Sequence, residues 1–308
     1  MRVEQENPAP VPSDARKLLV CETSHAMSHR PRVVFLIPLA SAHVVRDWHR
    51  ACAYFKQTLA SVFNSSGGNY CVVVVGHEPP DFPLPEDRRL KFLSLDHPLP
   101  SQEEGYWVAA VKDKMIKLAA AWDYAKRTWN PQYVMKLDWD DLVSSRLVEW
   151  LVSAEDEPGY RIKHGWIWRA TVPQLIQRTE QFDRSCGSCL IIRSDVADRT
   201  GPFLNSCEGA KLDQVSQQTE ASDLHSLVPG AATGTLLLND TPSRAEAQFA
   251  YLGYRLATVP FSAAVLRTGH GNNASGRYNR IQTLRMFLGS LRRTRLITPS
   301  VRKEFMLG

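Results

Sequence analysis

Short apolar runs alternate with amphipathic segments through the first half of the chain. The runs are rich in β-branched residues and predict buried strands of parallel-sheet type at 32–38, 70–76, 90–95 and 133–137. Apolar residues at helical spacing predict helices over about 44–62 and 107–127. This alternation predicts an α/β protein with an open, mostly parallel central sheet flanked by helices.

The second half of the chain is less regular. Its hydrophobic pattern predicts helices over 142–153, 244–252 and 277–295, and strands over 160–168, 186–193 and 257–266. Residues 205–235 are polar and predict no element. We expect three parts: a disordered tail at 1–30, one domain at 31–275, and a basic helical extension at 276–308.

The amino-acid composition adds little to the predicted fold. The formal net charge is +5, and arginines near the C-terminus account for much of it, so no nucleic-acid partner is expected. The six cysteines are scattered, and neither a signal peptide nor a membrane-length apolar stretch is seen, which predicts a cytoplasmic protein. The basic C-terminal helix is expected to dock on the domain; an alternative hypothesis places it on an anionic membrane surface.

An acidic cluster, Asp138-Trp-Asp-Asp141, follows the fourth predicted strand. Acid-x-acid triplets also occur at 4–6 and 155–157, about as often as chance predicts, but only this one caps a buried strand. Ligands of open α/β sheets bind beyond the carboxyl ends of the strands, and clustered carboxylates favour a bound cation. Mg²⁺ or Mn²⁺ suits these oxygen ligands. The alternative is that Asp140 or Asp141 caps a helix beginning at 142.

The segment 133–147, Tyr-Val-Met-Lys-Leu-Asp-Trp-Asp-Asp-Leu-Val-Ser-Ser-Arg-Leu, resembles the Asp-x-Asp region of GT-A-fold glycosyltransferases. It is most similar to bacterial family-2-like glycosyltransferases. Further similar segments occur in the same order at 34–41, 113–117, 165–168 and 186–193, so the resemblance covers about residues 32–270.

The resemblance implies a GT-A-like fold, with a Rossmann-like nucleotide-binding half and an acceptor half. It implies metal-dependent transfer of a sugar from a nucleotide-sugar donor to a saccharide, lipid-linked or other acceptor. Asp138 and Asp140 would then serve the donor and the metal, with Asp141 close by. His270, with His225 as its rival, would complete the metal site.

Other candidate residues carry alternatives. Lys114 and Lys117 are expected to reach a diphosphate or to form a solvated basic face, and Glu78 to accept from a nucleobase or to be a loop acid. Trp166 and Trp168 share a strand face that would stack on an acceptor sugar or pack in the core. The candidates for an inverting base are Glu208, Asp213, Glu220 and Asp223.

One further motif bears on the chemistry. Cys186-Gly-Ser-Cys189 has the spacing of a redox or zinc pair but enters a strand and lacks a second pair, so we expect its Gly and Ser to allow close approach of a sugar to the sheet. The runner-up function is a non-catalytic sugar- or nucleotide-binding protein. A metal-dependent nucleotidyl- or phosphotransferase is less favoured, because Pro38-Leu-Ala-Ser41 is not a glycine-rich phosphate loop.

Overall fold

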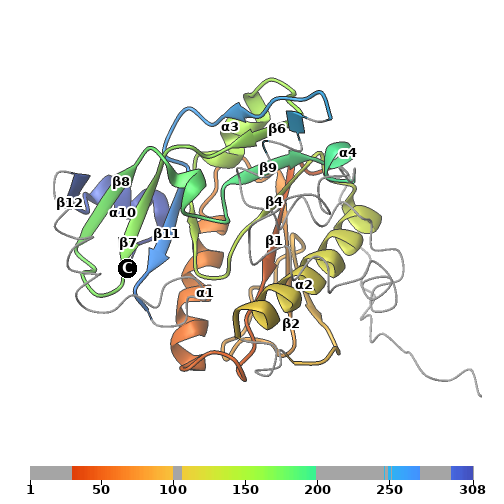
Figure 1. Cartoon of the computed structure of the whole chain (residues 1–308), viewed down its shortest axis with the longest axis vertical. Coiled ribbons are helices and arrows are strands. Elements are labelled where there is room, and N and C mark those ends of the chain that lie inside the picture. The colour runs from red at the N-terminus through yellow and green to blue at the C-terminus, as the bar shows by residue number, and fades with distance from the viewer. Residues whose placement is uncertain are drawn as a thin grey trace, which may run out of the picture.

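A computed structural model of the chain describes residues 30–99, 106–198, 252–270 and 293–307, together with Glu246, Phe249 and Ala250. In this part of the chain the strands form two sheets, which Figure 1 shows beside one another. The predicted tail at 1–30 lies outside the described residues except for Arg30. Of the helix predicted at 244–252, the three described residues 246, 249 and 250 are helical.

The first sheet has the strand order β10-β6-β9-β4-β1-β2-β3. Its strands are β1 (Val33–Pro38), β2 (Tyr70–Gly76), β3 (Leu90–Ser94), β4 (Tyr133–Lys136), β6 (Gly159–Arg161), β9 (Leu190–Arg193) and β10 (Ala257–Thr258). Only β9 runs antiparallel to its neighbours among these described strands. The structure confirms the predicted α/β class, with an open, mostly parallel central sheet flanked by helices.

Two long helices cover this sheet. Helix α2 (Tyr106–Trp129) lies across β1 and β2 in Figure 1. Helix α1 (Trp48–Phe63) begins later than predicted, because Asp47 caps it by accepting a hydrogen bond from the Arg50 N–H at 2.9 Å. Phe55 of α1 is buried in the first core, while Gln57 accepts from Arg267 of the second sheet at 2.7 Å. Helix α1 therefore packs between the two sheets.

The second sheet has the order β12-β8-β7-β11-β5. Its strands are β5 (Leu142–Val143), β7 (Gly165–Arg169), β8 (Leu175–Thr179), β11 (Ala264–Thr268) and β12 (Thr294–Leu296). The predicted strands at 160–168 and 257–266 are wrong as single elements, because each is two strands in different sheets. The chain crosses from β6 to β7 and from β10 to β11, and Pro260 interrupts the second run.

Three other predicted elements need correction. Residues 142–153 are not one helix: β5 pairs with β11, and helix α3 (Leu147–Ser153) begins afterwards. In the segment 186–193 the strand starts only at Leu190, and the Cys-Gly-Ser-Cys residues form the turn before it. Thr294 and Arg295, placed at the end of the predicted basic helix, are in strand β12; residues 277–292 lie outside the described part.

The C-terminal residues pack onto the second sheet. Helix α10 (Pro299–Phe305) is capped by Thr298, which accepts from the Val301 N–H, and places Phe305 in a core with Trp166 and Val265. The docking expected for the basic helix at 277–295 and the division at 276 stay predictions, because residues 277–292 lie outside the described part. None of the described helices combines the length and the apolar character needed to cross a membrane.

Replacing Phe305 with alanine should destabilise the protein by about 3–5 kcal/mol, because Phe305 is fully buried and its loss leaves a cavity in the second core. Chemical denaturation followed by circular dichroism measures this. The control Leu296→Ala, at a residue that is 69% exposed, should change stability by about 0.5 kcal/mol or less. Equal effects of the two substitutions would show that α10 is not part of the folded core.

Candidate functional site

The acidic residues occupy the junction between the two sheets. Strand β4 of the first sheet ends at Lys136, and β5 of the second sheet begins at Leu142, so Asp138–Asp141 form the connection. This turn is fixed by its backbone: the Asp138 N–H donates to Ser188 Oγ at 2.8 Å, and the Asp141 N–H donates to the Asp138 carbonyl at 3.0 Å. The predicted position beyond the carboxyl end of a buried strand is confirmed.

The alternative role of the motif as a helix cap is wrong. Helix α3 begins at Leu147, its N-cap residue is Arg146, and no side chain caps it. Neither Asp140 nor Asp141 is near enough in sequence to satisfy its first N–H groups.

Asp138 is paired with a lysine. Lys114 on α2 donates to its Oδ1 atom at 2.5 Å. Burial opposes ionisation of Asp138, but the positive charges of Lys114 and Lys136 outweigh burial and lower its pKa. Gly187 lies against the same carboxylate, because a Cβ at this position would stand 3.1 Å from Asp138 Oδ2 and 2.9 Å from Lys136 Nζ. A side chain at position 187 would therefore crowd Lys136 and Asp138, whereas the close approach of a sugar expected at this motif stays a prediction.

Asp140 faces His270, which was predicted from the sequence as a metal-ligand candidate. His270 Nε2 lies 2.7 Å from Asp140 Oδ2, although the two residues are 130 positions apart. The imidazole is fully buried, with its ring 4.9 Å from that of Tyr54 and 5.9 Å from that of Trp139. The second sheet therefore delivers an imidazole from the end of β11 to a carboxylate at the end of β4. The rival His225 lies outside the described residues.

Asp141 is buried among hydrogen-bond donors. Its Oδ2 atom accepts from Ser188 Oγ at 2.7 Å and from the Cys186 thiol at 3.1 Å, and its Oδ1 accepts from the Arg267 N–H at 3.3 Å. Burial and the neighbouring charges of Asp140 and Asp138 raise the pKa of Asp141 to about 8. Cys186 is a free thiol whose pKa is also raised by burial, so it acts as a hydrogen-bond donor.

The remaining predicted site residues are placed as follows. Glu78 is engaged by the loop after β1, where Ser41 Oγ and the Ala42 N–H donate to it. Lys117 is wholly buried and donates to Asp113 and to the Leu39 carbonyl, so it is not part of a solvated face. Glu208, Asp213, Glu220 and Asp223, the candidates for a base, lie outside the described residues.

Trp166 and Trp168 lie on one face of β7, as predicted, and that face is in the second core. They are 9% and 5% exposed and pack around Ile176, Val265 and Phe305. Stacking on a sugar requires an open ring face. The contacts of Trp166 and Trp168 are therefore those of the core-packing alternative, and we propose no acceptor role for the two rings.

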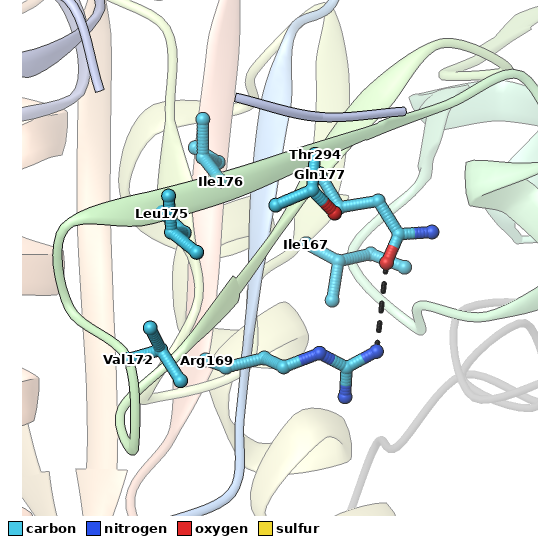
Figure 2. A pocket seen from close by; sticks show the side chains of 7 residues that line it. All are labelled: Ile167, Arg169, Val172, Leu175, Ile176, Gln177 and Thr294. Carbon is cyan, nitrogen blue, oxygen red and sulfur yellow. Dashed lines mark hydrogen bonds between the residues drawn. The ribbon is translucent and has the colours of Figure 1, made fainter. Parts of the chain in front are cut away.

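A shallow hollow on the second sheet is separate from these acids. Figure 2 shows it over β7 and β8, where Ile167 and Leu175 form part of an apolar lining. Arg169 donates there to Gln177 at 3.5 Å, and no carboxylate lines the hollow. It offers no set of converging acids or bases, so the chemistry is better assigned to the junction of the sheets.

Sequence reasoning missed a second polar cluster. His77 and His97 both contact Asp113 on α2, and their ligand atoms all lie within 4.8 Å of one another. Among the described residues, these are the only three possible metal ligands whose ligand atoms all lie within 4.8 Å of one another. The available signals were His77 at the end of the second predicted strand and the Asp113/Lys117 pair at helical i,i+4 spacing.

Comparison with known proteins gives limited information. No protein-family model matches the chain, and no curated protein matches it in sequence. Two solved structures with similar folds are both of S. aureus TarS. The fragment 1–349 has 11% identity and a TM-score of 0.39 over 77% of this chain; the longer TarS structure has 11% identity and a TM-score of 0.36 over the same share.

These alignments cover 60% and 37% of the two TarS chains, so this chain spans less than two thirds of their length.

The raised pKa of Asp141 predicts a pH-dependent stability in metal-free protein. The folded state keeps a proton that the unfolded state releases near pH 3.8, so this contribution to stability is lost as the pH rises towards about 8. Between pH 5 and 8, wild type should lose stability relative to Asp141→Asn, by at most about 1.4 kcal/mol per pH unit. Urea denaturation in EDTA measures this. Parallel plots of stability against pH for wild type and Asp141→Asn would contradict this prediction. The control Asp96→Asn, at an exposed carboxylate, should follow wild type.

Proposed function

We propose that this protein is a metal-dependent glycosyltransferase that moves a sugar from a nucleotide-sugar donor to a saccharide, lipid-linked or other acceptor. The observation that carries the proposal is the contact between Asp140 and His270 beside Asp138. It brings an oxygen and a nitrogen ligand together at the carboxyl edge of an open α/β sheet, where such sheets bind their ligands.

The side-chain chemistry of Asp140 and His270 suits a divalent cation, and these two residues would be its first ligands. The ligand atoms of Asp138, Asp140 and His270 do not all lie within 4.8 Å of one another, so Asp138 would join the other two only by leaving Lys114 and moving towards them. An imidazole among the ligands favours manganese over magnesium, because magnesium binds oxygen ligands almost exclusively. When bound, the cation would offset the negative charge that develops on the departing nucleoside diphosphate.

The residues around the acids have distinct roles in this proposal. Lys114, once released from Asp138, would contact the diphosphate, and Arg267 adds a buried positive charge close to Asp140 and Asp141. Asp141 would fix the turn through its hydrogen bonds from Ser188 and Cys186, while burial and the charges of Asp140 and Asp138 raise its pKa. Glu78 orders the loop after β1, which the donor nucleotide would approach.

A thermal-shift panel of nucleoside diphosphates with and without Mn²⁺ tests this proposal. One diphosphate should raise the Tm by several degrees only when Mn²⁺ is present, since ligand at 100 times its Kd adds about 2.7 kcal/mol. Asp140→Asn should lose this shift, because it removes a carboxylate from the proposed ligand set. Glu180→Gln, at an exposed acid, should retain it.

The outcomes separate the proposal from its alternative. Absence of a metal-dependent shift with every diphosphate would refute the metal-dependent donor site. A metal-dependent shift without release of nucleoside diphosphate from the matching sugar nucleotide, in the presence of an acceptor extract, would favour a non-catalytic nucleotide-binding protein. The identity of the base, the acceptor, a cytoplasmic location and contact with a membrane stay predictions.

A further inference from the structure

Two histidines and an aspartate converge at the edge of the first sheet. His77 follows β2, His97 follows β3, and Asp113 lies on α2. The Nε2 atoms of His77 and His97 lie 3.0 Å and 2.9 Å from the same atom, Asp113 Oδ1. Three elements that are separate in sequence thus bring two imidazole nitrogens and one carboxylate oxygen close together.

The cluster is buried and its side chains are held in place. The three side chains are 9%, 2% and 10% exposed, in the order His77, His97 and Asp113. The imidazole rings stack with 4.2 Å between centroids. Lys117 donates to the other oxygen of Asp113 at 2.7 Å and to the Leu39 carbonyl at 2.8 Å. Because Lys117 occupies Oδ2, the carboxylate presents Oδ1 to both histidines.

The two histidine nitrogens and the Asp113 oxygen lie within 4.8 Å of one another, near enough to share one ion. In a tetrahedral zinc site, ligand bonds of about 2.0–2.2 Å place the ligand atoms about 3.3 Å apart. The observed separations of 2.9 and 3.0 Å differ from this by a few tenths of an ångström, which small side-chain shifts would supply. Two imidazoles with one carboxylate favour zinc-like ions over magnesium or calcium.

We propose that His77, His97 and Asp113 form a zinc site that is separate from the acidic motif. Lys117 orients the Asp113 carboxylate, and a water molecule or other exogenous ligand takes the fourth position. The bound ion ties the ends of β2 and β3 to α2, at the same edge of the sheet at which the acidic motif lies. The two sites differ in their ligands, so they are expected to select different metals.

The test measures zinc retained by protein prepared without a histidine tag. After equilibration with zinc and dialysis against buffer, wild type should retain about one ion per chain by elemental analysis. His97→Gln removes a ligand that is nearly inaccessible to solvent and should weaken binding at least tenfold. His49→Gln is the matched control, because the His49 side chain is 92% exposed, and it should bind as wild type does.

A second measurement needs no substitution in the cluster. Cobalt added to wild-type protein should give the intense visible absorption of a tetrahedral site, and zinc should abolish it. Asp140→Asn should keep both the cobalt spectrum and the zinc, even though it is expected to lose the manganese-dependent diphosphate response. Failure of this inference is therefore distinguishable from failure of the proposed transferase function.

Two results would overturn the zinc site. One is wild-type protein that retains no zinc after dialysis and gives no tetrahedral cobalt spectrum. The other is a folded His97→Gln protein that retains as much zinc as wild type, which would place the ion elsewhere in the chain.

Discussion

Three carboxylates lie at the end of β4, Asp140 and Asp141 buried and Asp138 half-buried, and compensation of their charge constrains the structure around them. A buried, unpaired carboxylate costs several kcal/mol, so each needs a compensating group. Asp138 pairs with Lys114 from α2, Asp140 contacts His270 from the end of β11, and Asp141 accepts hydrogen bonds from the turn before β9 while burial and the neighbouring carboxylates raise its pKa. Elements from both sheets must therefore meet at this point for the chain to fold.

The same point is where the chain leaves the first sheet for the second. Residues 138–141 connect β4 to β5, and the later crossings from β6 to β7 and from β10 to β11 repeat this passage. Helix α1 fills the space between the sheets, since Thr58 Oγ1 donates to the Trp139 carbonyl and Ser61 Oγ accepts from the Val143 N–H. Residues that serve the proposed site thus also hold the two sheets together, so a substitution there risks affecting both stability and binding.

Sequence patterns predicted the elements whose burial is uniform. Strands β1 and β2 are buried along their whole length, and the acidic residues after β4 could be placed because a continuous apolar run preceded them. The second sheet was not predicted, since its strands are as short as two residues and continue apolar runs that begin in the first sheet. Periodicity shows that Trp166 and Trp168 share a face, but it does not show that Phe305 covers that face from the far end of the chain.

Contacts between distant residues limit prediction of the site in the same way. Asp138, Asp140 and His270 could be named as candidates from the motif and its resemblance, and the structure brings His270 to Asp140. The partners that set the ionisation of these residues could not be named. Ser188 and Cys186 reach Asp141 only because β9 is inserted antiparallel beside β4, and strand pairing of this kind leaves no periodic signal in either segment.

Helix α2 gives one side chain to each proposed metal site. Asp113 and Lys114 are adjacent, and because successive residues of a helix point about 100° apart, one faces the histidines and the other faces Asp138. Lys117, one turn later, returns to Asp113 and fixes the helix to the Leu39 carbonyl beyond β1. A rotation of α2 that freed Lys114 from Asp138 would also displace Asp113 from His77 and His97. A metal ion that ties these histidines to α2 would therefore oppose that rotation, and Lys114 would have to leave Asp138 by changing its own rotamer.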